Sequence, residues 1–173
     1  MKIKTTVAAI SLMFGSAAFA QVDSLDADTI NVAQQAWADG IVSIGAAHTA
    51  GEDAKNVASQ LLEELYAFDQ KVLFKPTKAA ADPFRNSYDE ALSYFVGGSI
   101  EEDTGFAIQP WTAVRFENED MLIHGDYAVA MGHYYFTGTD GKETKVEYTF
   151  GYRLTDDGKI KIDLHHSSLP FGG

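Results

Sequence analysis

Stretches of alternating polar and apolar residues fill the second half of the chain and set the strongest limit on its fold. They cover Thr112–Ile123, Asp126–Thr137, Val146–Leu154 and Ile160–Leu164. The short sequences Thr139-Asp140-Gly141-Lys142 and Thr155-Asp156-Asp157-Gly158 separate the last three. A period of two residues is typical of strands with one buried face, and short Asp-Gly turns join antiparallel neighbours. The pattern therefore predicts an antiparallel meander with one apolar face.

Apolar residues recur at steps of three and four in the first half, as helices require. A first helix is predicted from Asp28 or Thr29, either of which can cap it, to about His48. Gly40 and Gly45 either break this helix or let another backbone approach it. Further elements are expected as a helix from Glu52–Asp53, a short strand at Val72–Phe74 and a helix over Pro83–Phe95.

The order of these elements predicts the fold class. Helices that precede a long antiparallel meander favour an α+β domain, in which the helices pack on the sheet. No internal repeat and no linker interrupt residues 21–173, so we expect a single domain there. If the sheet curls around the helices, its inner face forms a cone with a pocket.

The first twenty residues have the pattern of a secretory signal peptide. Lys2 and Lys4 precede the apolar run Val7–Phe14, and Ala18-Phe19-Ala20 has the small-x-small form of a cleavage site. The apolar run is too short to span a bilayer. We expect cleavage near Gln21, a periplasmic or secreted protein, and no membrane attachment afterwards.

Composition excludes several classes of protein. The chain has no Cys, so neither a disulfide scaffold nor a cysteine nucleophile is possible. Its net charge is −12, and removal of the signal, which holds two lysines and no acidic residue, makes it −14. A field of this sign repels phosphate backbones and anionic membranes, so we expect no nucleic-acid partner.

The familiar catalytic signatures GxSxG, GxxxxGK[ST], HExxH and GxGxxG are also missing. A metal site would have to draw on the histidines at positions 48, 124, 133, 165 and 166. His165 and His166 are neighbours on a predicted strand and point to opposite faces, which disfavours joint ligation. We therefore expect no metal, with a zinc or manganese site as the alternative.

The last strand ends in the unusual run His165-His166-Ser167-Ser168. Strand alternation places His165 with Ser167 on one face and His166 with Ser168 on the other. One His–Ser pair should therefore look into the cone and the other outward. The sequence does not decide which.

Four segments carry a resemblance to a known family: LFKPTKA, WTAVRFEN, VEYTFGY and LHHSSLP, in this order. Together they resemble the iota-class carbonic anhydrases and, more distantly, the association domain of calcium/calmodulin-dependent protein kinase II. The resemblance runs from about Ala50 to Phe171. It implies the nuclear-transport-factor-2-like cone fold, with N-terminal helices on a curved antiparallel sheet, and a homodimer.

The resemblance also implies an activity, the reversible hydration of CO2 to bicarbonate and a proton. The residues implied as catalytic are Thr77, Tyr94 and Ser167, with His165 beside Ser167 as a proton carrier that titrates near neutrality. Tyr88 lies close to Tyr94 and is the alternative pocket tyrosine.

Three further residues are expected to contact the substrate: Ser168, His166 and Arg153. For Arg153 a salt bridge within this acidic chain is the competing interpretation.

Two other functions remain open at this point. The cone could be a ligand-binding or oligomerisation module without catalysis, as the kinase association domain is. It could also be an isomerase or dehydratase, which would need a carboxylate or His base deep in its pocket. No Asp or Glu stands clearly on the predicted inner face, which disfavours the isomerase.

Overall fold

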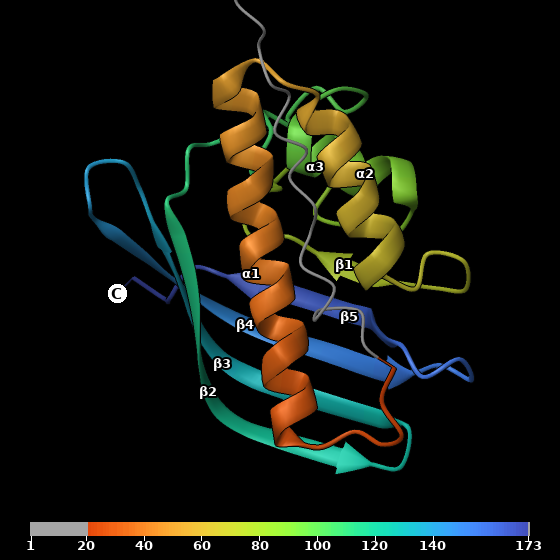
Figure 1. Ribbon diagram of the computed structural model, residues 1–173. Coiled ribbons are helices and arrows are strands. Elements are labelled where there is room, and N and C mark those ends of the chain that lie inside the picture. The colour runs from red at the N-terminus through yellow and green to blue at the C-terminus, as the bar shows by residue number, and fades with distance from the viewer. Residues whose placement is uncertain (1–20, 173) are drawn as a thin grey trace, which may run out of the picture.

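Figure 1 shows the computed structural model, which describes residues 21–172. The predicted signal peptide lies outside the described residues. The elements follow in the order α1 (Ala27–Ala50), α2 (Ala54–Leu65), β1 (Leu73–Lys75), α3 (Tyr88–Val96), β2 (Ala113–His124), β3 (Tyr127–Thr137), β4 (Glu143–Leu154) and β5 (Ile160–Ser168). Within residues 21–172 no helix has the length and apolar character needed to cross a membrane.

The five strands form one curved, unclosed sheet in the order β1-β5-β4-β3-β2. Strands β2 to β5 make the predicted antiparallel meander. The short strand β1 joins its far side and runs parallel to β5, with Leu73 opposite Leu164 and Lys75 opposite His166. The sheet is therefore mixed rather than purely antiparallel. The expected α+β architecture of helices on a curved sheet is confirmed.

Helix α1 runs through both of its glycines without a break. Asp26 caps it, two residues earlier than Asp28, because its side chain and that of Thr29 form a reciprocal capping box. A Cβ at Gly45 would lie 2.9 Å from the carbonyl oxygen of Gln109 and 3.1 Å from that of Ala107. Gly45 therefore does not break the helix but lets another segment of backbone approach it closely.

The prediction of a helix from Pro83 was wrong. Helix α3 begins at Tyr88, with Ser87 as its cap. The preceding residues fold back on β1 instead, where the Arg85 amide donates to the carbonyl of Phe74 at 2.8 Å. A tertiary hydrogen bond thus overrides the local helical pattern.

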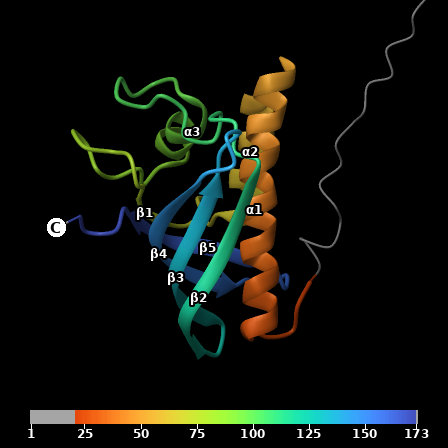
Figure 2. The same cartoon turned by 90° about the vertical axis from the view of Figure 1, so that its left-hand side faces the viewer.

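The core lies between α1 and the inner face of the sheet. Figure 2 shows α1 along one side of the sheet. Trp37 lies at its centre, with ring centroids 5.6–6.3 Å from those of Phe116, Tyr134, Phe136 and Phe150. Such edge-to-face contacts add to the hydrophobic stabilisation of this inner layer.

Strand β5 includes the run His165-His166-Ser167-Ser168, and a β-bulge before this run changes which of its residues face inward. Ile162 pairs with Tyr152 and Leu164 with Gly151, so Asp163 has no partner in the ladder. Uninterrupted alternation from the buried Ile162 would have turned His166 and Ser168 inward. The extra residue instead turns His165 and Ser167 into the core and His166 outward.

Gly151 is what allows this bulge to pack. A Cβ there would lie 2.8 Å from Cβ of Leu164, and closer than 3 Å to the ends of the Tyr127 and Asp163 side chains. The side-chain ends can move, but a Cβ moves only with the backbone of β5.

We therefore predict that Gly151→Ala lowers the free energy of unfolding by about 1–3 kcal/mol, the usual cost of overpacking. Urea unfolding followed by circular dichroism measures it. Gly172→Ala is the matched control, since its Cβ would meet nothing within 4 Å. Equal stability of the two variants would show that β5 accommodates a side chain at this position.

Candidate functional site

A cluster of hydroxyl groups lies where β1, α3, β3 and β5 meet. We call Thr77, Tyr94, Tyr134 and Ser167 the hydroxyl cluster. The Thr77 hydroxyl donates to Oγ of Ser167 at 2.9 Å. Ser167 and Thr77 lie close enough to the Tyr134 phenol to offset part of the rise that burial causes in its pKa. Thr77 has the same effect on the pKa of the Tyr94 phenol. The cluster thus joins three residues predicted from sequence and one that was not.

Each member is placed by a different element. Ser167 lies on the inner face of β5 and pairs with Tyr148 of β4. Thr77 follows the end of β1, which the parallel pairing holds against β5. Tyr94 comes from α3, and its hydroxyl accepts a hydrogen bond from the Lys78 amide at 3.3 Å. Tyr134 comes from β3.

Burial controls the chemistry of the two phenols. Tyr94 is 4% exposed and Tyr134 1%. Loss of hydration is the largest cause that raises the pKa of both phenols well above the ordinary value. Both therefore stay protonated at neutral pH and act as hydrogen-bond donors. Ser167 is buried as well, whereas Thr77 is half-buried, so the cluster reaches the surface at Thr77.

His165 lies two residues from Ser167 on the same face of β5 and ends a buried hydrogen-bond chain. The indole N–H of Trp37 donates to the Tyr66 hydroxyl at 2.9 Å. That hydroxyl lies 2.8 Å from Nδ1 of His165. Because the Tyr66 oxygen already accepts from Trp37, its own proton is available for Nδ1. This arrangement makes Nδ1 the acceptor and places the ring proton on Nε2.

The His165 ring is held neutral. It is 2% exposed, stacks on Phe74 at a centroid distance of 4.5 Å and contacts Phe150 at 4.1 Å. Burial first, and the nearby His166 second, lower the pKa of His165 well below its usual range. The structure therefore argues against the expected proton carrier that titrates near neutrality. Nε2 of His165 has no hydrogen-bond partner among the described residues.

The three residues expected to contact substrate do not join the cluster. His166 is exposed on the outer face of the sheet. Ser168 shares that face, where its hydroxyl donates to the Glu147 carboxylate at 3.4 Å. Arg153 pairs with Lys161 near the other end of β5 and forms an ion pair with Asp163 at 3.2 Å. For Arg153 the salt-bridge interpretation is the one that the structure supports.

The structure separates the two candidate tyrosines. Tyr94 lies in the cluster, whereas the Tyr88 hydroxyl faces Glu63, 3.4 Å from its carboxylate. Sequence reasoning missed Tyr134, although the alternation of β3 carried the signal. A period of two places Tyr134 on the face opposite that of Tyr127, Met131 and Tyr135.

No group of three or more His, Asp or Glu side chains in residues 21–172 is arranged to hold a metal ion. His165 is buried, while His166 points outward from the next position of the strand. The site therefore offers hydroxyl groups and one neutral imidazole. Such a set can orient a water molecule and donate hydrogen bonds to a small oxyanion.

Comparison with known proteins places these residues in a family. The profile of the metal-independent carbonic anhydrases matches residues 28–169. A metal-independent carbonic anhydrase from Nostoc sp. (strain PCC 7120) is 38% identical over 145 residues, which cover 80% of this chain and 71% of the relative. The crystal structure of a cyanobacterial iota-carbonic anhydrase complexed with bicarbonate is similar with a TM-score of 0.84 and 35% identity. That match covers 87% of this chain and 95% of the other.

More distant structures share the fold alone. An association domain of the calcium/calmodulin-dependent protein kinase II type from Xanthomonas campestris has 23% identity and a TM-score of 0.57, covering 87% of this chain and 92% of its own. A nuclear-transport-factor-2-like protein from Salmonella enterica has 13% identity and a TM-score of 0.53, covering 84% and 91%. The predicted cone fold is thereby confirmed.

The hydrogen bonds of His165 predict its titration. Because its pKa is depressed in the folded state, the ring should stay neutral, with the proton on Nε2, as the pH falls through about 6.5, where an unfolded histidine takes up a proton. Only the unfolded state gains a proton there, so the free energy of unfolding should fall by up to about 1.4 kcal/mol per pH unit below 6.5 from this group.

Nitrogen-15 NMR of the imidazole rings measures both the tautomer and the charge of His165. Tyr66→Phe is the informative variant, because it removes the donor to Nδ1 and should change the tautomer signal. An imidazolium spectrum for His165 in the folded protein at pH 6 would contradict the assignment.

Proposed function

The chain belongs to the metal-independent carbonic anhydrase family, and from this premise we propose that its hydroxyl cluster is the site where CO2 is hydrated to bicarbonate and a proton. The observation that carries the proposal is the contact of Thr77 with Ser167 at 2.9 Å, beside two buried phenols. The bicarbonate complex of the cyanobacterial relative supports it. The likeness to the kinase association domain supports only the shared fold.

The reaction needs a water molecule aimed at the carbon of CO2. Thr77 donates its proton to Ser167, so the Ser167 proton is free to donate and both oxygens can accept from water. Held between them, the water oxygen forms a bond to carbon, while one C=O electron pair moves onto an oxygen of CO2. The water gives up one proton, and bicarbonate results. The contribution of the two hydroxyls is orientation, which lowers the entropic part of the barrier.

The phenols of Tyr94 and Tyr134 stabilise the oxygen that becomes negative. Their raised pKa keeps them protonated, so each can donate a hydrogen bond while remaining neutral. Donors fixed in a buried site stabilise developing charge more than they would in water. We assign the Nε2–H of His165 the same task, because it is a buried donor without a protein partner on the Ser167 face of β5.

The released proton leaves through the half-buried end of the cluster at Thr77. A buried imidazole with a depressed pKa cannot carry it, and the phenols are already protonated. Water at the Thr77 end is therefore the acceptor. The family's description as metal-independent agrees with the expectation that no zinc or manganese is needed. Because the site relies on positioning and hydrogen bonding alone, we expect its rate of CO2 hydration to be lower than that of enzymes that use zinc-bound hydroxide.

We expect Thr77→Ala and Ser167→Ala each to lower kcat/KM for CO2 hydration by roughly 10- to 100-fold, since each removes one of the two groups that orient the water. Proton release followed in a stopped-flow apparatus measures the rate. Thr144→Ala is the matched control, because this exposed strand hydroxyl lies outside the cluster.

Treatment with a chelator should leave the rate unchanged. No CO2 hydration by the wild type, with or without added Zn2+ or Mn2+, would overturn the proposed activity. Activity that is lost on chelation and restored by metal would overturn its metal independence.

We further propose that the protein is exported and acts as a homodimer. The signal-like pattern of residues 1–20 supports export to the periplasm or beyond. The outer face of the sheet supports the dimer, because it carries the exposed apolar side chains Leu122, Tyr127 and Met131. Exposed apolar groups gathered on an uncovered sheet are typical of interaction sites. A second copy of the chain is the partner we assign to this face.

Native mass spectrometry of protein produced with its full sequence in a bacterial host tests both points. The subunit mass should correspond to a chain that starts near Gln21, and the assembly should have twice that mass. Met131→Glu should shift the assembly to the monomer, because it places a charge on the outer face. An unprocessed N-terminus would contradict export, and a wild-type monomer would contradict the dimer.

A further inference from the structure

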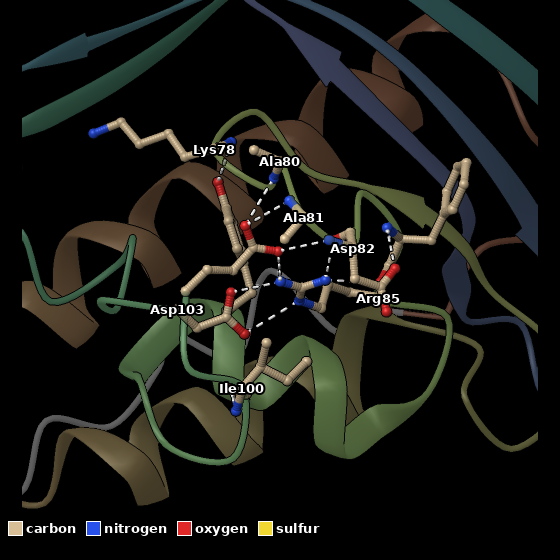
Figure 3. Close-up of polar contacts among 11 residues, drawn as sticks. Lys78, Ala80, Ala81, Asp82, Arg85, Ile100 and Asp103 are labelled. Carbon is tan, nitrogen blue, oxygen red and sulfur yellow. Dashed lines mark hydrogen bonds and ion pairs between the residues drawn. The ribbon is translucent and has the colours of Figure 1, made fainter.

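Glu102, in the acidic segment Ser99–Gly105, holds the loop that carries Thr77. Its carboxylate accepts hydrogen bonds from three successive backbone amides, those of Ala80 at 2.9 Å, Ala81 at 3.0 Å and Asp82 at 3.1 Å (Figure 3). A single carboxylate thus holds the backbone of three consecutive residues. Hydrogen bonds to an ionised acceptor are about twice as strong as neutral ones.

Arg85 fixes Glu102 in turn. Its guanidinium is buried and donates to Glu102 at 3.0 Å and to both oxygens of Asp103 at 2.8 and 3.1 Å (Figure 3). Its Nη1 group donates to the carbonyls of Asp82 and Phe84, so all three guanidinium nitrogens have acceptors and the buried cation is paired with two carboxylates. The three amides and Arg85 lower the pKa of Glu102 to about 2, so the carboxylate is ionised at any working pH.

The other polar contacts of the loop from 75 to 84 lie at its two ends. Lys75, Thr77 and Lys78 are hydrogen-bonded at the start, and Nη1 of Arg85 donates to the carbonyls of Asp82 and Phe84 at the end. The base of the loop is closed where the Arg85 amide donates to the Phe74 carbonyl and the Phe74 amide donates to the Asn86 side chain. Residues 80–82 and Phe84 are exposed, so hydrophobic packing does not fix the upper part of the loop. Glu102 holds the amides of residues 80–82, and Arg85 holds the carbonyls of Asp82 and Phe84. This ion pair therefore fixes the path of the backbone that leaves Thr77.

We propose that Glu102 is a positioning residue for the reaction, which sets the location of the Thr77 hydroxyl by fixing the backbone of residues 80–82. The inference rests on the proposed function of the hydroxyl cluster. Among residues 21–172 the hydrogen bonds of Glu102 go to the loop and to Arg85 and not to the cluster, so it acts only through the loop. Hydroxyls that orient a water must be held closely, because a shift of about 1 Å can cost up to 100-fold in rate.

The test compares Glu102→Gln with Glu101→Gln, each made in the wild type and in Thr77→Ala. Glutamine keeps the volume of Glu102 but offers an N–H2 group where a carboxylate oxygen accepts, so amide contacts are lost. Glu101 is an exposed neighbour that makes the control matched in sequence and charge. We expect Glu102→Gln to lower kcat/KM roughly 10-fold in the wild type and less than about 2-fold further in Thr77→Ala. Glu101→Gln should change neither.

Amide hydrogen exchange supplies a second reading that does not depend on activity. The Lys78 amide, which donates to Tyr94, should exchange at least about 10-fold faster in Glu102→Gln than in Glu101→Gln. Glu102→Asp, which keeps the charge on a shorter side chain, should recover part of both effects. It also provides the comparison if the glutamine variant does not fold.

The outcomes separate the two proposals. Unchanged Lys78 exchange would overturn the positioning role whether or not the enzyme is active. Equal fold losses of activity in the wild type and in Thr77→Ala would also overturn it, because a general loss of structure acts independently of Thr77. A wild type without CO2 hydration would overturn the proposed function, while the exchange data would still decide whether Glu102 fixes the loop.

Discussion

The β-bulge at Asp163 is the constraint on which the candidate site depends. Without the extra residue, the alternation that buries Ile162 would bring His166 and Ser168 into the core and leave Ser167 on the surface. With it, β5 buries Ile162 before the bulge and both His165 and Ser167 after it. Bulges commonly redirect side chains next to active sites. Gly151 provides the space, since any side chain there would meet Leu164.

A second constraint is the parallel run of the segment from Tyr66 to Lys75 beside β5. A bridge pairs Tyr66 with Ile162, and β1 continues the contact to Lys75. This single pairing supplies three things to the site: the hydroxyl that binds Nδ1 of His165, the ring of Phe74 that stacks on it, and the approach of Thr77 to Ser167. Polar groups from distant parts of the sequence are thus brought into one buried network, in which each hydrogen bond is strengthened by its low-dielectric surroundings.

Periodicity predicted much of this arrangement, and its limits are physical. The meander followed from alternation because each strand buries one face, and the pairing of His165 with Ser167 followed from the same rule. Alternation along one strand could not reveal the bulge, because a bulge is defined by how two strands pair, with two residues of one opposite a single residue of the other. The wrong start of the third helix has a similar cause, since the bond from the Arg85 amide to Phe74 is a tertiary contact that local periodicity does not contain. Thr77, Tyr94 and Ser167 came from family resemblance. Alternation along the strand could place Tyr134 on one face but could not show which hydroxyl groups lie beside it.

The two faces of β5 show how a site can operate in a strongly acidic chain without a metal. The inner face is buried, and its members are neutral: protonated phenols, aliphatic hydroxyls and an uncharged imidazole. No charged side chain of the described cluster must be desolvated, so the usual cost of burying an ion does not arise. The charges lie elsewhere, on the outer face at Glu147 and in the Arg85–Glu102–Asp103 contacts that support the loop. The charged side chains of Arg85, Glu102 and Asp103 therefore hold the backbone in place. Neutral hydrogen-bond donors are the groups that act on the substrate, which starts uncharged and becomes an anion. A site built in this way stabilises the negative charge only as it develops, which is the condition for accelerating the reaction rather than merely binding its product.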